Sequence, residues 1–457
     1  MNENENEREH VVFIDPEVDN LTFERKTIIR PKEGNIIRVK GYIKSKDSLL
    51  VEASIIAHEI NIDNKLHVKG DLETISINVA NKLTVEGFCK SDTINVANSF
   101  ILGGILEAES VNVGNSLKSE HEISVKNLKI GASFKGKGLI RGEFFSTGGS
   151  CSFAGNIDVT ETINVGGSFT VTGEVKTTKL ITGGTITVTE NLLAENIKTG
   201  GSLELNNAKF LKLKAGGSLR CESELIFGSI ELGGKIIANG LLKGKKMEVG
   251  GSVYCMDTII VSIIEVGSKI LTEQDLICSD IQVGGKIISK GFIYASINLQ
   301  VGGKVKAGRQ LVADNIEIGG KVHAQQVICK NIEVGQSIAT DTGIFVAEIL
   351  RIGKKSTITG PIIGGIISIS SKSVVEDIYG DTITIGRKSS TRNLYGKHIT
   401  IQDLAKINGK LEYTDTLHLG EDIVFSSEPL KVEELPTRPI AKESEKDFSQ
   451  NLLELEE

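Results

Sequence analysis

A short motif, Ile-x-Val-Gly-Gly, recurs along the chain at a nearly constant spacing. It stands at 163–167 and 281–285, and as Ile-Glu-Ile-Gly-Gly at 316–320. We call the residue before the glycines the anchor. Anchors run from Ile62 to Leu419, a separation of 357 positions. This separation contains 21 intervals with an average length of seventeen residues, and no interval differs from the average by more than one residue. A short period without insertions is typical of repeat proteins in which each repeat packs only against its neighbours.

Hydrophobic residues alternate with polar ones inside each repeat. The residue two before the anchor is apolar in all 22 repeats, although only 39% of the chain is hydrophobic. In the repeat that follows Val283 we assign three inward pairs: Ile287 with Ser289, Tyr294 with Ser296, and Leu299 with Val301. Alternation of period two indicates strands, and we expect glycine at the corner to supply a positive φ and room for stacking.

These patterns predict an all-β fold, a single-stranded parallel β-helix (β-solenoid) of about 24 coils of about 17 residues, right-handed and triangular. We expect the solenoid to occupy residues 28–426. Residues 1–27 are polar and acidic and predict a mostly disordered tail. Residues 427–457 contain three prolines and end in ESEKDFSQNLLELEE, which predicts an acidic tail with a possible short helix. The register of coils 352–401 stays open, because Ser356, Ser373 and Ser389 occupy a slot that is apolar elsewhere.

The charge distribution argues against nucleic acid and membrane partners. The net charge is −7, and the acidic ends carry it, since residues 1–9 hold −3 and residues 428–457 hold −5. The nearly neutral remainder is a poor electrostatic match for nucleic acid or an anionic membrane. The start, MNENENEREH, lacks an apolar core, so we expect no signal peptide. With no long apolar run, we expect a cytoplasmic protein without membrane insertion.

The sequence offers no recognisable catalytic, cofactor or metal motif. No interval exceeds the average by more than one residue, so no long loop is available to wall a substrate cleft. The six cysteines fall at inward slots without a CxxC pair, which indicates small buried hydrophobes in a reducing compartment. We therefore expect no enzyme, no bound cofactor and no metal site.

One outward slot, six residues before the anchor, changes character along the chain. Over the first repeats it is mixed and often charged, and then ten consecutive repeats carry no charge there. We call these residues the predicted stripe: Ile260, Ile277, Ala295, Val312, Ile328, Val346, Ile363, Tyr379, Tyr395 and Tyr413. Apolar patches of this extent are rarely left exposed. Two alternatives follow, in which the stripe makes a lateral contact with another solenoid or partner, or the C-terminal tail folds back and covers it.

The uninterrupted repeat, its Ile-x-Val-Gly-Gly motif and the proline-bearing tail resemble the bactofilin family of polymer-forming cytoskeletal proteins. The resemblance covers roughly residues 28–426. It implies a solenoid that stacks end to end into non-polar filaments without nucleotide, so the expected partner is the protein itself. At the C-terminal end, Ile423 and Phe425 would continue the inward columns with no further coil above them. The alternatives are a non-polymerising scaffold or spacer that binds partners through the stripe and tails, and an adhesin or carbohydrate-acting β-helix.

Overall fold

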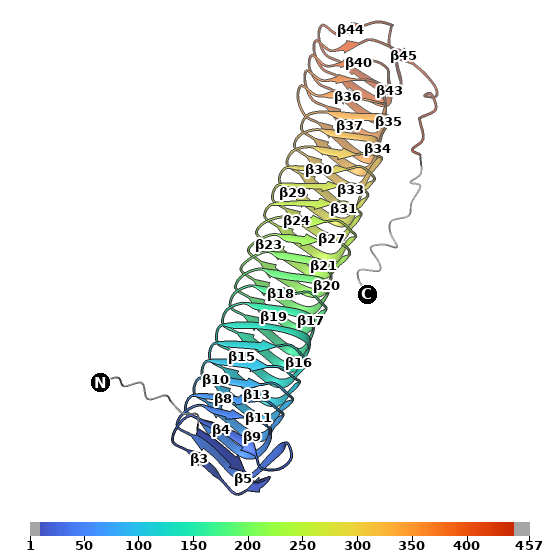
Figure 1. Ribbon diagram of the computed structural model, residues 1–457. Helices are drawn as coiled ribbons and strands as arrows, with labels where there is room; N and C mark the ends of the chain where they lie inside the picture. Colours follow the sequence, from blue (N-terminus) through green and yellow to red (C-terminus); the bar gives the residue numbers. More distant parts are fainter. Residues whose placement is uncertain (1–9, 443–457) are drawn as a thin grey trace, which may run out of the picture. The chain divides into compact units, whose positions relative to one another are not determined.

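The computed structural model describes residues 10–442, in which every regular element is a strand and no helix occurs. The chain forms two compact units, residues 1–217 and 218–457, and each is described by itself. Both are built of short parallel strands stacked coil upon coil (Figure 1), about 25 coils in total with a repeat of about 17 residues. The predicted β-solenoid is confirmed.

The first unit contains the following strands: β1 (His10–Ile14), β2 (Glu17–Val18), β3 (Leu21–Phe23), β4 (Thr27–Pro31), β5 (Ile36–Ser45), β6 (Leu49–Val51), β7 (Ser54–Ile62), β8 (Lys65–Val68), β9 (Leu72–Val79), β10 (Lys82–Val85), β11 (Cys89–Val96), β12 (Ser99–Leu102), β13 (Leu106–Val113), β14 (Ser116–Ser119), β15 (Ile123–Ile130), β16 (Ser133–Thr147), β17 (Cys151–Val165), β18 (Phe169–Val171), β19 (Val175–Thr182), β20 (Ile186–Thr199) and β21 (Leu203–Ala215).

The second unit contains the remaining strands: β22 (Leu219–Cys221), β23 (Leu225–Leu232), β24 (Ile236–Ala238), β25 (Leu242–Val249), β26 (Ser252–Cys255), β27 (Ile259–Val266), β28 (Lys269–Thr272), β29 (Leu276–Val283), β30 (Lys286–Ser289), β31 (Ile293–Val301), β32 (Val305–Ala307), β33 (Gln310–Ile318), β34 (Val322–Val334), β35 (Ile338–Ile352), β36 (Thr357–Thr359), β37 (Ile362–Ile369), β38 (Val374–Val375), β39 (Ile378–Ile385), β40 (Ser390–Thr391), β41 (Leu394–Ile401), β42 (Lys406–Ile407), β43 (Leu411–Leu419), β44 (Val424–Phe425) and β45 (Leu430–Lys431).

A typical coil has three sides, each with two inward side chains. Strand β10 forms the first side and buries Leu83 and Val85. The longer strand β11 forms the other two sides, because a bend near its middle shifts the alternation of inward and outward residues by one position. Strands β10 and β11 pair in parallel with β12 and β13, their equivalents one repeat further along the chain. Each inward residue therefore stacks on its equivalent one coil away, and the core consists of six columns of mostly apolar side chains, in which buried residues such as Ser91 and Thr272 are the polar exceptions.

The corner glycines are required for space rather than for a positive φ, so that part of the prediction is wrong. The amide of Gly284 donates to the carbonyl oxygen of Val266 in the coil before it, at 3.0 Å. A β-carbon at Gly284 would lie only 2.4 Å from the carbonyl oxygen of Gly267. Neither glycine has a φ in the left-handed region. Glycine is needed here because consecutive backbones approach too closely for any side chain.

The last coils replace the glycine corner by a tighter turn. Lys355, Lys372 and Lys388 have φ values of 60°, 63° and 59°, and each is followed by a buried serine. The hydroxyl of Ser356 donates to the carbonyl oxygen of Gly353 at 2.8 Å, and the amide of Ser356 donates to the next serine hydroxyl at 3.2 Å. This ladder satisfies the polar side chains inside the core and settles the register of coils 352–401.

Both boundaries of the solenoid lie outside the predicted range 28–426. Residues 10–27, assigned to a disordered tail, form β1 to β3, which pair in parallel with β4 and β5. The apolar run 11–14 forms most of β1 and buries Ile14, a signal that the surrounding acidic residues and Pro16 obscured. At the other end β45 pairs with β43, which extends the solenoid to Lys431. The predicted C-terminal helix, in the segment ESEKDFSQNLLELEE, lies outside the described residues.

Candidate functional site

The second unit carries a continuous line of apolar side chains on the outside of its second side. Register places nine residues in this apolar column: Ile260, Ile277, Tyr294, Val312, Ile328, Phe345, Ile363, Tyr379 and Tyr395. None is fully exposed. The rings of Tyr379 and Tyr395 stack with their centroids 4.9 Å apart. The predicted stripe therefore exists, and most of its members are placed correctly.

Three members of the predicted stripe are wrong, for one geometric reason. Ala295 and Val346 point into the core and are buried, and Tyr413 pairs with inward-facing Gly396. Each lies in a coil that is one residue longer than usual, and the extra residue sits at the corner between the second and third sides. Counting back six residues from the anchor therefore reaches an inward residue. The outward residues are Tyr294, Phe345 and Glu412, and the assignment of Tyr294 and Ser296 as an inward pair is also wrong, because Ile293 and Ala295 point inward.

A segment after the last strand crosses back over this side of the second unit. We call residues 432–442 the strap (Figure 1). The amide of Val432 donates to the carbonyl oxygen of Tyr413 at 2.9 Å. Further on, the Arg438 guanidinium donates to Asp381 Oδ1 at 2.9 Å. At its end the carbonyl oxygen of Lys442 accepts from Gln310 Nε2 at 3.2 Å. The strap thus runs across the coils from β43 to β33, toward lower residue numbers.

A second outward line of side chains, at the corner before the second side, lies beside the apolar column. Asp275, Phe292, Gln310 and Gln326 occupy this corner line in four consecutive coils, and all four are buried. Phe292 packs with Ile277, Ile260 and Tyr294 in a cluster on the outside of the coil. Burial of four successive outward side chains is unusual for a solvated face of a solenoid. The corner line and the apolar column together form a largely apolar surface, in which the polar side chains of Asp275, Gln310 and Gln326 are buried.

Asp381 is the ion-pair partner that holds the strap. Burial opposes its ionisation, but hydrogen bonds from Lys397 and Arg438 outweigh this effect and lower the pKa of the carboxyl. Asp381 is partly exposed, so the contact contributes only modestly to stability. It fixes where the strap crosses the second side.

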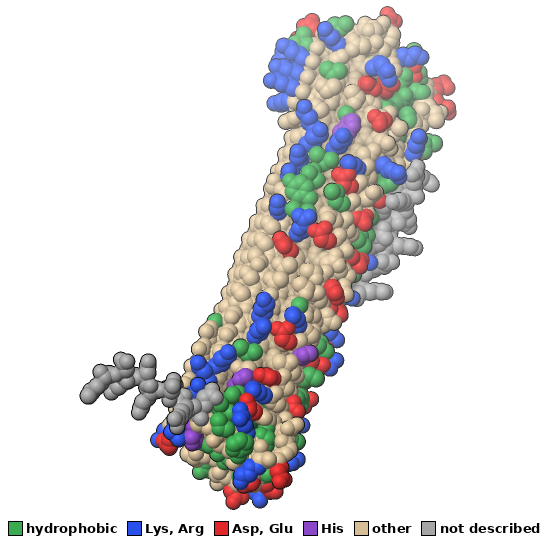
Figure 2. All heavy atoms as spheres, viewed as in Figure 1, with side chains coloured by type: hydrophobic (Ala, Val, Ile, Leu, Met, Phe, Trp, Pro, Cys, Tyr) green, Lys and Arg blue, Asp and Glu red, His purple; other side chains and the backbone are tan. Residues whose placement is uncertain are grey.

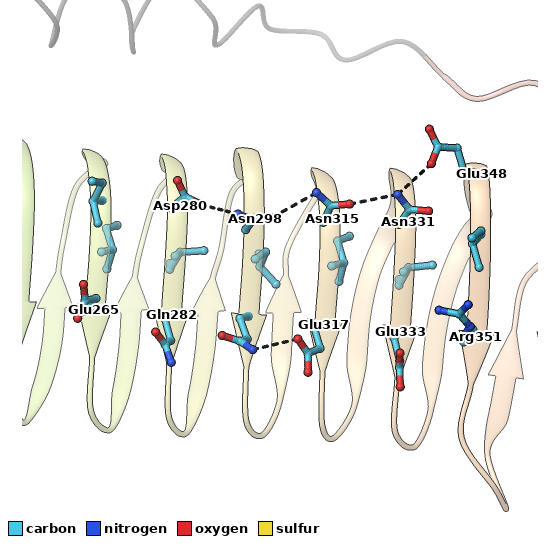
Figure 3. Close-up of a pocket in the computed structure, with 18 residues that line it drawn as sticks. Glu265, Asp280, Gln282, Asn298, Asn315, Glu317, Asn331, Glu333, Glu348 and Arg351 are labelled. Carbon is cyan, nitrogen blue, oxygen red and sulfur yellow. Dashed lines mark hydrogen bonds between the residues drawn. The ribbon is translucent and has the colours of Figure 1, made fainter.

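The third side of the second unit forms a shallow polar groove of about 770 Å³. Figure 3 shows a ladder of side chains along one rim. Asn298 Nδ2 donates to Asp280 Oδ1 at 2.6 Å, Asn315 Nδ2 donates to Asn298 Oδ1 at 3.2 Å, and Asn331 Nδ2 donates to Asn315 Oδ1 at 3.1 Å. On the other rim Gln300 Nε2 donates to Glu317 Oε2 at 2.9 Å. In these ladders each amide donates to an amide or carboxylate oxygen of a neighbouring coil, so their evident role is to hold successive coils in register.

An apolar patch on the first side was missed by the sequence analysis. Ile237, Tyr254 and Leu271 stack at successive coils and line a groove of about 530 Å³ together with exposed Met256. The ammonium of Lys269 lies 4.9 Å from the centroid of the Tyr254 ring. The spacing of one repeat between these side chains is the signal that could have revealed the patch. Figure 2 shows hydrophobic side chains grouped on the middle of the second unit.

The corners of the last coils carry a line of basic residues. Lys354, Lys355, Lys372, Arg387 and Lys388 lie at the tight turns described above, where Figure 2 shows a group of basic side chains. Within residues 10–442 no ion pair joins any of the five to an acidic group. These five residues therefore form a line of positive charge at one corner of the C-terminal coils.

The C-terminal coil leaves the ends of the inward columns open. Phe425 pairs with Ile407 and continues its inward column, as predicted, but it is only half-buried. Leu419 ends another inward column and is exposed. Ile423 is half-buried and belongs to no strand. These two columns thus reach the last coil of the described solenoid without a further described coil above them.

The six cysteines are buried inside the solenoid, as expected. Burial raises the pKa of the Cys89 thiol to about 12 and that of the Cys221 and Cys255 thiols to about 11. A thiol with such a pKa carries almost no thiolate near neutral pH, and the thiolate is the reactive form. These residues act as packing groups of the core. Over the described part of the chain, no group of three or more acidic, histidine or cysteine side chains is arranged to hold a metal ion.

Comparison with known proteins adds no relative. No protein-family model, no curated protein and no solved structure matches the chain. Between residues 10 and 442 there is no helix of the length and hydrophobicity that a membrane span requires.

Proposed function

We propose that this protein is a structural, bactofilin-like cytoskeletal or scaffold protein that polymerises end to end in the cytoplasm without nucleotide. The observation that carries the proposal is the open C-terminal coil. Phe425 and Leu419 end two inward columns that are apolar in the coil before them, where they pair with Ile407 and Ile401. A further coil supplied by another molecule would cover both side chains.

Hydrogen bonding at the ends supports the same proposal. In a parallel solenoid every interior coil has a neighbour on both sides, whereas the terminal strands have a neighbour on one side only. At the N-terminal end β1 pairs with β4 alone, and at the C-terminal end β44 pairs with β42 alone. Unpaired strand edges are templates for pairing with another chain, and stacking would extend the columns and the hydrogen-bond ladders together.

Sedimentation of two neighbouring variants tests the proposal. Phe425→Arg would place a charge in the joint and should shift the protein to smaller species, with an unchanged circular dichroism spectrum. Val424→Arg is the matched control, because Val424 is exposed and points away from the column. ATP, GTP or a chelator should leave the sedimentation profile unchanged. Equal profiles for Phe425→Arg and the parent protein would contradict this joint.

The first-side patch favours a second candidate function. Tyr254, Leu271 and Met256 form a surface that neither the strap nor the core uses. A non-polymerising scaffold would bind partner proteins there and display its tails. Single particles at all concentrations, with loss of partner binding in Tyr254→Glu, would support this alternative.

A further inference from the structure

We propose that residues 443–457 dock on the same chain, over the apolar column and corner line between Val312 and Ile260. The strap leads directly to this surface. It ends at Lys442, which is held by the side chain of Gln310, and Gln310 itself donates to Gln326 Oε1 at 2.9 Å. The strap runs toward lower residue numbers, so the next coils in its direction are those of Tyr294, Ile277 and Ile260.

Burial continues beyond the point at which the strap ends. Gln310 and Gln326 lie beside Lys442, but Phe292 and Asp275, one and two coils further on, are also buried. Ile277, an outward member of the apolar column, is buried as well, whereas its neighbours Ile260 and Tyr294 are only half-buried. The outside of these coils therefore has the character of a covered surface.

The length of the remaining chain suits this surface. From Val312 to Ile260 there are three coil steps, or about 14 Å at the spacing of parallel strands. Fifteen residues span about 22 Å as a helix and about 50 Å when extended. Residues 443–457 can therefore reach every coil of the proposed site without any change in the strap.

The composition of the segment suits the surface too. Phe448, Leu452 and Leu455 are spaced so that a helix would place them on one face. The segment also holds six acidic residues and one lysine, a net charge of −5. The site is bounded by basic residues, since Lys243 and Lys245 lie on β25, and Lys243 pairs with Ile260, the first residue of the apolar column. The Arg309 guanidinium lies 5.3 Å from the Phe292 ring centroid. Apolar side chains flanked by acids complement an apolar surface flanked by bases.

A fluorescence experiment on the full chain can test this directly. The chain has no tryptophan, and its six native thiols are buried with raised pKa values. A cysteine introduced by Gln450→Cys can therefore be labelled selectively with bimane, whose emission is quenched by tryptophan at contact distance. Tyr294→Trp places the quencher in the apolar column. Ile288→Trp is the matched control, because Ile288 faces outward from the first side of the same coil.

We expect loss of most of the bimane emission with Tyr294→Trp and none with Ile288→Trp. Ile277→Asp, or Phe448→Ser combined with Leu452→Ser and Leu455→Ser, should restore the emission. Leu193→Asp, a change at the equivalent slot of the first unit, should not. Equal emission from the two tryptophan variants, or quenching that persists in Ile277→Asp, would overturn the proposal. Quenching that appears only when labelled and tryptophan-bearing chains are mixed would overturn it as well, because the occupant would then be a second copy.

Discussion

The two units carry apolar side chains at the same outward slots, but within residues 10–442 buried examples occur in the second unit alone. In the first unit Ile105, at the corner slot, is 43% exposed, and Leu193, at the column slot, is 37% exposed. In the second unit Phe292 and Ile277 occupy the same two slots and are each 2% exposed. The inward columns of the two units are alike, so the coil itself does not cause the difference. Inward positions determine the fold, and outward positions distinguish a solvated face from a contact surface.

The neighbours of these side chains explain the contrast. Leu193 lies between Lys176 and Lys209 in its column, whereas Ile277 lies between Ile260 and Tyr294. An isolated apolar residue among lysines is an ordinary surface feature. A continuous apolar column bordered by a strap is an interaction surface.

The largest predicted effect separates inward from outward aromatic residues. Phe134 points into the core of the first unit and packs against Phe153 and Phe145, with ring centroids 5.6 and 5.5 Å away. Phe134→Ala should cost about 3–5 kcal/mol and lower the thermal midpoint of its unit. Phe345→Ala, in the outward column of the second unit, should cost about 1 kcal/mol or less. Similar midpoints for the two variants would contradict the assigned register.

The next effect concerns association rather than stability. Deleting residues 443–457 should expose the apolar column and increase side-by-side association, measured by light scattering at increasing protein concentration. Adding Ile277→Lys, Val312→Lys and Ile328→Lys to the truncated chain should abolish this association while leaving the circular dichroism spectrum unchanged, because the three side chains point outward. Unfolding of the triple variant would show that the slot faces inward.

The smallest effect concerns the ion pair that holds the strap. Because the pKa of Asp381 is lowered in the folded protein, its contribution is present above the ordinary carboxyl pKa of about 3.9 and is lost as the pH falls through the lowered value. A fluorophore on Ile440→Cys, at an exposed strap position, should lose anisotropy over that acidic range. Asp381→Asn should lower the anisotropy slightly at neutral pH, with a cost below about 1 kcal/mol. Asp314→Asn, whose partner is Lys330, is the control, and an equal change in both variants would argue against the Asp381 contact.

The sequence was sufficient to predict the three-sided coil, because the apolar inward residues alternate as in strands and recur at every repeat, as stacked coils require. The sequence was insufficient to assign outward slots near the corners. In a coil with one extra residue, that residue can lie before or after the slot, and the count from the anchor does not show which. Ala295, Val346 and Tyr413 were misplaced for this reason, while Ile260, Ile277 and Val312, in coils of the usual length, were placed correctly. Of the two causes predicted for glycine at the corners, room for stacking is confirmed and positive φ is wrong, since the limiting contact is with a carbonyl oxygen of another coil.

The surfaces were predictable only in part. The apolar column follows from periodicity, and the first-side patch around Tyr254 would have followed from the same count. The path of the strap depends on single long-range contacts, such as Arg438 with Asp381, which lie far apart in the chain and belong to no repeat. Such contacts cannot be obtained from a pattern within one coil.

End-to-end assembly is tested most directly by electron microscopy of the purified full-length protein without nucleotide or added metal. We predict filaments one solenoid wide, and Phe425→Arg should convert them to short species while Val424→Arg should not. If the parent protein remained as single particles over a wide range of concentration, polymerisation through the terminal coils would be contradicted.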